Sequence, residues 1–278
     1  MNAPDKLDLP FFAYGLFRPG QLAFFQVRDL LGSVVEPVIM NGTLLLRDGL
    51  PILDSSGHGH VVGAVLTFST NRTMEAYDRI SAMEPDNHYR WEEAQVDGKA
   101  VNVLVGRYPK KGSVYCEDEE WNGWRDPLFT SALDVVEETL GSQEFEWNLK
   151  PLFRLQMAYL LLWSAIERYV SLRYGLSNNI MEKIGKLANE PAFATSLRHH
   201  VKEERNVFRA DSPSKKKSLN ANSPQCSVDY YYQVRCNITH RGKAAVRDYE
   251  LLKQSLTELL PIFRDVLRAA ENDALYSV

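Results

Sequence analysis

The periodicity of the apolar residues changes partway along the chain, and this change constrains the fold more than any other feature of its 278 residues. Up to about Tyr108 the apolar residues form short runs bounded by turn residues, which is typical of β-strands. Beyond Pro127 they recur every three or four residues, which is typical of one face of a helix. The sequence therefore predicts an α+β protein with a strand-rich domain over 1–108, a linker over 109–126 and an all-α helical domain over 127–278.

The first domain is expected to be a small mixed barrel in which two helices interrupt the strands. The expected strands lie near 10–14, 42–46, 61–68, 91–96 and 100–105. The expected helices lie near 21–31 and 72–83.

Two apolar stripes predict long helices in the second domain. The first stripe consists of Leu155, Tyr159, Leu162, Ile166 and Tyr169, and the second of Leu252, Leu256, Leu259, Phe263 and Val266. Pro261 interrupts the second stripe, so we expect it to kink or divide that helix. The polar stretch 209–224 between the two is expected to be an exposed loop.

Composition and charge indicate a globular cytoplasmic protein. The three cysteines, Cys116, Cys226 and Cys236, are far apart and odd in number, which favours a reducing compartment over a disulfide framework. The apolar run 157–166 is too short to span a bilayer, and the acidic first residues do not resemble a signal peptide. Residues 1–126 carry a net charge of −6 and residues 127–278 one of +2, which permits a polyanionic partner for the second domain.

An ordered set of short motifs runs through the first domain. The first expected strand ends in Tyr14-Gly-Leu-Phe-Arg-Pro-Gly20, and a later helix leads into Glu84, which precedes Tyr89 and Arg90. Glycines in a turn after a strand let the backbone fold tightly and can present free amides to an anion. From the residues alone, an ordinary strand-to-helix connection and a solvated acid at a helix end explain these features as well.

This succession resembles the γ-glutamylcyclotransferase family over about Phe11 to Tyr108. The resemblance implies that Tyr14, Gly15 and Leu16 bind the substrate and that Glu84 is the catalytic acid and base. The implied reaction cyclises a γ-glutamyl group to 5-oxoproline without a metal or other cofactor. Binding of such a small molecule without turnover is the alternative for this domain.

A second motif lies in the helical domain, within Arg235-Cys-Asn-Ile-Thr-His240. Arg235 and His240 are five positions apart, so they point about 140° away from each other on a straight helix. A shared site therefore needs a kink, a long reach by the arginine or a second copy of the chain. Asn237 and His240 are three apart and lie on one face.

The motif and its flanking helices resemble the HEPN superfamily over about Pro127 to Ala270. That resemblance implies a homodimeric, metal-independent ribonuclease in which His240 transfers protons, Arg235 neutralises the phosphate and Asn237 contacts the substrate. Five basic residues are candidate RNA contacts: Lys215, Lys216, Lys217, Arg241 and Lys243. A solvated basic loop and a structural Arg and His at a helix end are the alternatives.

Taken together, the two resemblances predict a two-domain protein that combines a γ-glutamyl site with an RNase of toxin or antiviral-defence type. The alternative is an active cyclotransferase whose helical domain only dimerises or binds nucleic acid. No metal site is expected, because His58 and His60 have no third ligand at suitable spacing.

Overall fold

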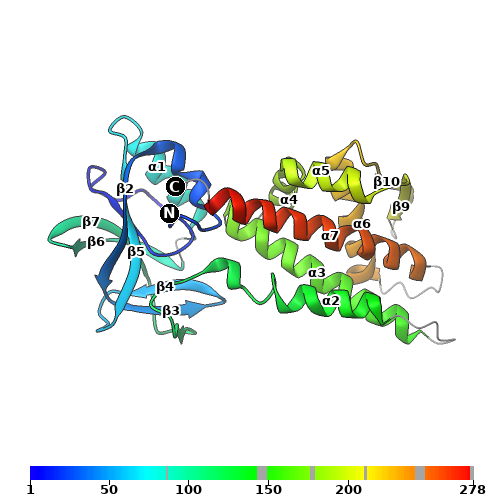
Figure 1. Ribbon diagram of the computed structural model, residues 1–278, viewed down its shortest axis with the longest axis horizontal. Helices are drawn as coiled ribbons and strands as arrows, with labels where there is room; N and C mark the ends of the chain where they lie inside the picture. The colour runs from blue at the N-terminus through cyan, green and yellow to red at the C-terminus, as the bar shows by residue number, and fades with distance from the viewer. Residues whose placement is uncertain (86, 143–148, 176–178, 210–211, 242–247, 276–278) are drawn as a thin grey trace. The chain divides into compact units, whose positions relative to one another are not determined.

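The computed structural model describes residues 1–278 except 86, 143–148, 176–178, 210–211, 242–247 and 276–278 (Figure 1). The chain divides into two compact units, described separately below. Unit 1 comprises 1–126 together with 171–178 and 271–278, and unit 2 comprises 127–170 and 179–270. The boundary after Asp126 matches the change in periodicity, whereas the assignment of two later segments to unit 1 has no signal in the sequence.

The main sheet of unit 1 has five strands in the order β2-β5-β1-β7-β6. They are β1 (Phe11–Ala13), β2 (Leu31–Asn41), β5 (His60–Phe68), β6 (Tyr89–Val96) and β7 (Lys99–Gly106). Strand β1 is central and pairs parallel to β7, while the other pairings are antiparallel. All three β1 residues are buried, as expected for a short apolar strand covered on both faces.

A second sheet of unit 1 has the order β4-β3-β8. It consists of β3 (Thr43–Arg47), β4 (Leu50–Asp54) and β8 (Val114–Tyr115). Strand β8 lies inside the range expected to be a linker, and η3 (Gly123–Arg125), a 3₁₀ helix, follows it. The indole of Trp121 donates to the Gly49 carbonyl and that of Trp124 to the Gly20 carbonyl. The range 109–126 is therefore an integral part of unit 1.

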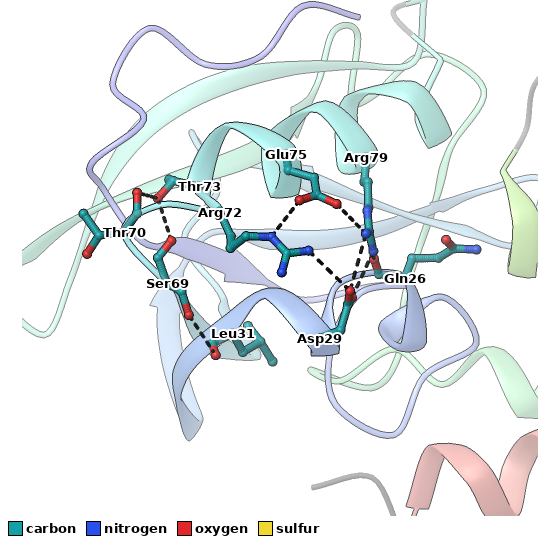
Figure 2. Close-up of polar contacts among 9 residues, drawn as sticks. All are labelled: Gln26, Asp29, Leu31, Ser69, Thr70, Arg72, Thr73, Glu75 and Arg79. Atoms are coloured by element: carbon teal, nitrogen blue, oxygen red, sulfur yellow. Dashed lines mark hydrogen bonds and ion pairs between the residues drawn. The ribbon is translucent and has the colours of Figure 1, made fainter.

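Helix α1 (Thr73–Met83) buries Ala76, Tyr77 and Ile80 within unit 1. Its solvent side carries a network of charged residues, which Figure 2 shows. Arg79 donates to Glu75 at 2.6 Å, to Asp29 at 2.9 Å and to the Gln26 carbonyl at 2.7 Å. Exposed ion pairs contribute little individually, but this network ties the helix to the segment before β2. The end of α1, where Glu84 follows, is thereby fixed within the unit.

The helix expected at 21–31 is replaced by two short 3₁₀ helices, η1 (Phe24–Gln26) and η2 (Arg28–Leu30). Phe24, Phe25 and Val27, which lose rotamer freedom in a helix, lie at the centre of this segment, and strand β2 begins at Leu31. The α-helix prediction for this segment was wrong. The expected helix at 72–83 and the five expected strands are present, each within a few residues of its expected bounds.

Unit 2 contains α2 (Ser131–Gly141), α3 (Lys150–Tyr174), α4 (Ile180–Ala188), α5 (Pro191–His200), α6 (Pro224–Arg241) and α7 (Asp248–Leu275). The last residues of α3 and α7 are grouped with unit 1. All ten residues of the two apolar stripes are buried, which confirms that these stripes form the core of the unit. Pro261 lies inside α7, which continues through it, so the expected division of this helix does not occur. Apolar burial on both sides of Pro261 offsets the missing backbone hydrogen bond.

The sequence predicted an all-helical second domain, and this prediction was wrong, because unit 2 also contains two strands. The polar stretch forms an antiparallel hairpin of β9 (Arg205–Arg209) and β10 (Ser212–Leu219). Val207 and Leu219 are buried, so two apolar residues anchor a hairpin whose other residues are largely polar. Among the described residues, no helix is long and apolar enough to cross a membrane.

Candidate functional site

A small cavity in unit 1 lies where β1 ends, beside β4 and the end of α1. It brings together the loop Tyr14–Leu16 and Glu84, two features 70 residues apart that the sequence had assigned to one site. Its lining consists of Phe11, Ala13, Tyr14, Gly15, Leu16, Phe17, Pro51, Glu84 and Tyr89.

Glu84 supplies the only titratable carboxyl group of this lining. It is the C-cap residue of α1, and its backbone amide donates to the Ile80 carbonyl at 3.2 Å. The residue is only 6% exposed, and its Oε2 is buried without a hydrogen-bond partner among the described residues. Burial penalises the charged carboxylate and raises the pKa of Glu84 to about 8. The group can therefore both take up and release a proton near neutral pH.

The residues of the loop after β1 line this cavity. The Arg18 amide donates to the Gly15 carbonyl at 3.0 Å and so closes a tight turn. Among the described residues, no acceptor takes a hydrogen bond from the amides of Gly15, Leu16 or Phe17. Gly15 is required here, because a Cβ atom at this position would lie 2.7 Å from Cγ of Pro51. Because these three residues line the cavity, their amides are the candidate donors there for a carboxylate or an oxyanion.

The hydroxyl of Tyr14 is not free for a substrate. It donates to the Leu104 carbonyl at 2.7 Å and accepts from the Leu53 amide at 3.3 Å. Burial, and to a smaller extent the nearby Glu84 carboxylate, raises the pKa of the Tyr14 phenol. The Tyr89 hydroxyl also bonds to the backbone, since it donates to the Pro51 carbonyl at 3.0 Å. These two side chains hold the walls of the cavity in place.

The cavity is narrow. The space open to the centre of a water molecule is about 20 Å³, which is sufficient for about one ordered water. A γ-glutamyl group needs more room, so binding it requires a shift of a wall side chain. Leu16 and Phe17 belong to the loop and not to a strand, so theirs are the wall side chains that we expect to shift.

The candidate site of unit 2 lies on α6, where the structure places Arg235 against α3. Its Nη2 lies 3.3 Å from Oε1 of Glu167, and its guanidinium lies 5.6 Å from the ring centre of Tyr232. Burial raises the pKa of the neighbouring Cys236 thiol, while the Arg235 charge opposes that rise. Arg235 is thus a partly exposed cation held by a carboxylate and an aromatic ring.

Asn237 is not placed beside Arg235. Its Nδ2 donates to the Phe208 carbonyl at 2.9 Å, and its Oδ1 accepts from Gln233 at 3.0 Å. Two positions apart on a helix correspond to about 200°, so Arg235 and Asn237 face opposite ways. The Asn237 amide therefore holds strand β9 against α6, and the structure gives it no free group for a substrate.

The basic residues divide into three groups. Lys215 and Lys216 are exposed on β10, whereas Lys217 forms an ion pair with Asp229 of α6 at 2.6 Å. The backbones of His240 and Arg241 form the last turn of α6, but their side chains lie outside the described part of the chain. Lys243 lies outside the described residues altogether.

Sequence reasoning missed most of the walls of the unit 1 cavity. Phe11, Phe17 and Pro51 carry no chemistry that a motif would reveal, and Phe11 of β1 and Pro51 of β4 belong to different sheets, which only the tertiary fold brings together. Within the described residues, no group of three His, Cys, Asp or Glu side chains is placed to hold a metal ion.

Comparisons with protein-family models, with curated proteins and with solved structures found no match to this chain.

Proposed function

We propose that unit 1 binds a γ-glutamyl compound and cyclises it to 5-oxoproline, with Glu84 as the acid and base. The observation that carries the proposal is a buried carboxyl group, one oxygen of which has no hydrogen-bond partner among the described residues, beside a loop with three amides that are not hydrogen-bonded there. A carboxyl whose pKa is near 8 can exchange protons at physiological pH. The resemblance of the motif order to the γ-glutamylcyclotransferases suggested the same residues independently.

The proposed reaction needs one nucleophile and one proton carrier. The α-amino nitrogen of the γ-glutamyl group attacks its own γ-carbonyl carbon and forms the ring C–N bond. The carbonyl oxygen becomes negatively charged in the transition state, and the amides of Gly15, Leu16 and Phe17 are the donors available to it. Glu84 takes the proton from the attacking nitrogen and returns it to the leaving amine as the original amide bond breaks.

Release of 5-oxoproline from γ-glutamyl dipeptides and amines tests this proposal. Glu84→Gln keeps the shape of the side chain but cannot carry a proton, so the rate should fall by about 10²- to 10⁴-fold. Asp78→Asn, which changes an exposed acid on the same helix, should leave the rate unchanged. Turnover that survives Glu84→Gln would contradict the proposal. Binding without turnover in the unchanged protein would instead support the alternative of ligand sensing.

For unit 2 we propose metal-independent cleavage of RNA, as the second activity. The supporting observation is that Glu167 and Tyr232 hold Arg235 as a partly exposed cation, ready to contact a phosphate. A homodimer that brings two such motifs together stays a prediction.

Cleavage of single-stranded RNA in the presence of a chelator tests the second proposal. His240→Ala should reduce the rate by about 10²- to 10⁴-fold, because the reaction then lacks its proton carrier. His199→Ala is the matched control, since this exposed histidine of α5 lies outside the motif. If His240→Ala cleaves RNA as fast as the unchanged protein, unit 2 does not act as this kind of nuclease.

A further inference from the structure

A second cavity of unit 1 is much larger than the one beside Glu84, and both polar and apolar side chains line it. The space open to the centre of a water molecule is about 520 Å³. Its floor is one face of the β4-β3-β8 sheet, because Thr43 pairs with Asp54 and Leu45 with Tyr115 across neighbouring strands. Side chains of such pairs lie on the same face of a sheet. The turn after β4 and the segment before β8 form its sides.

The turn is pressed closely against the floor. A Cβ atom on Gly57 would lie 2.0 Å from Oγ1 of Thr43, so only glycine permits this approach. The Gly57 amide donates to the Asp54 carbonyl at 3.1 Å, and the Gly42 amide donates to the Gly59 carbonyl at 3.0 Å. Backbone hydrogen bonds and this close approach therefore fix the shape of this side of the cavity.

Asp54 places a negative charge in the wall of this cavity. Its side chain is only 6% exposed, and its Oδ1 accepts from the Ser56 hydroxyl at 2.6 Å and from the Ser56 amide at 3.1 Å. These hydrogen bonds from Ser56 hold the pKa of Asp54 below its usual value, although burial opposes them. The carboxylate is therefore ionised and fixed in one orientation before any ligand arrives.

The only cation beside Asp54 among the described residues holds it loosely. Nζ of Lys110 lies 3.8 Å from Oδ2, longer than a charge-assisted hydrogen bond, and the lysine side chain is 81% exposed. Such a pair contributes little free energy, and the lysine can swing away at small cost. Ser113, which also lines the cavity, has a buried Oγ without a hydrogen-bond partner among the described residues.

We propose that this cavity binds a free amino acid with an apolar side chain, whose ammonium group contacts Asp54 and whose carboxylate contacts Lys110. The ligand ammonium would take the place of Lys110 at Oδ2, and the freed lysine would then follow the ligand carboxylate. The Ser113 hydroxyl, which has no hydrogen-bond partner among the described residues, would donate to that carboxylate. Leu45 and Tyr115 supply the apolar and aromatic wall for the ligand side chain. The site is separate from the Glu84 cavity and does not depend on the function proposed for it.

Three probes test this proposal: leucine and two derivatives, each of which lacks one of the two charges of leucine. They are L-leucine, N-acetyl-L-leucine, which lacks the ammonium group, and L-leucinamide, which lacks the carboxylate. Each is titrated into the full-length protein at millimolar concentration, and the amide NMR signals of Ser56, Gly57 and Ser113 are followed. Leucine should bind, N-acetyl-leucine should bind about 10- to 100-fold more weakly, and leucinamide about 2- to 5-fold more weakly. No shift with leucine, or equal binding of N-acetyl-leucine, would overturn the proposal.

Two variants test which residue contacts each charged group of the ligand. In Lys110→Ala, a surface change that should not affect folding, leucine and leucinamide should bind equally well. In Asp54→Asn, which keeps an acceptor for Ser56, the preference for leucine over N-acetyl-leucine should disappear. A Lys110→Ala protein that still prefers leucine to leucinamide would contradict the assignment. Glu84→Gln should leave all three affinities unchanged, which separates this test from that of the proposed cyclisation.

Discussion

Glu84→Gln is expected to stabilise the protein at alkaline pH. It should remove the part of the fall in the free energy of unfolding with rising pH that Glu84 causes. Glu84 has a pKa of about 8 in the folded protein and about 4.5 when exposed, so the folded state holds its proton more tightly. Between these values the unfolded state loses the proton first, and stability falls as the pH rises. The loss at pH 9 amounts to at most about 5 kcal/mol, from about 1.4 kcal/mol for each pKa unit. Glutamine has no such proton to lose.

Urea denaturation over a series of pH values measures this effect. The difference in the free energy of unfolding between Glu84→Gln and the unchanged protein should grow from about pH 4.5 to about pH 8 and then level off. Asp78→Asn, on the exposed side of the same helix, should follow the unchanged protein. Parallel curves for Glu84→Gln and the unchanged protein would show that Glu84 is not a buried carboxyl with a raised pKa.

Glu258→Gln is expected to destabilise unit 2 by about 2 to 4 kcal/mol, because it leaves the charge of Arg205, whose side chain is only 16% exposed, without its carboxylate partner. Glu258 of α7 is 8% exposed and accepts from Nη1 of Arg205 at 2.8 Å, and its other oxygen also contacts Arg205. The Tyr231 hydroxyl of α6 donates to the same carboxylate at 3.0 Å. One carboxylate therefore joins the β9 hairpin to α6 and α7.

Hydrogen exchange of the α6 and α7 amides, measured in urea, reports on unit 2 separately from unit 1. Glu250→Gln is the matched control, since Glu250 is exposed on the same helix and should change stability by less than about 0.5 kcal/mol. Replacing Arg205 and Glu258 together by apolar residues should recover much of the loss, because no unpaired charge then remains. A single Glu258→Gln change without effect would show that the pair does not hold the hairpin.

The sequence predicted what depends on local periodicity. The stripes beginning at Leu155 and Leu252 repeat every three or four residues over several turns, and burial of one helix face follows directly from that spacing. The strands near 61–68 and 100–105 were predicted because β-branched residues are concentrated in them. In contrast, β2 was missed, because its mixed burial gives neither a clean alternation nor a continuous apolar run.

Long-range pairing accounts for what the sequence could not predict. The Lys215–Lys217 segment was taken as a loop on its polarity, although pairing with β9 and two buried anchors make it a strand. Pairing of Val114 and Tyr115 with β3 likewise turns the expected linker into the edge of a sheet. Such pairings depend on residues distant in the chain, so the local propensity of a segment does not predict them.

The candidate site of unit 1 was predictable in part. Glu84 and the loop at Tyr14 were named through a family resemblance, and the structure places both at one cavity. The role of the Tyr14 hydroxyl was not predictable, because its acceptor, the Leu104 carbonyl, comes from a strand 90 residues away. The Asp54 cavity was not predicted, because its turn was considered only for a metal at His58 and the rest of its lining is scattered between Thr43 and Tyr115.

The central claim is that Glu84 is a proton carrier held ready in a buried cavity, and an NMR titration of its side-chain carboxyl carbon tests this most directly. The signal is assigned by its absence from Glu84→Gln and followed across the pH range in which the protein stays folded. The account predicts a midpoint near pH 8. A midpoint near 4.5, the ordinary value for an exposed glutamate, would contradict it.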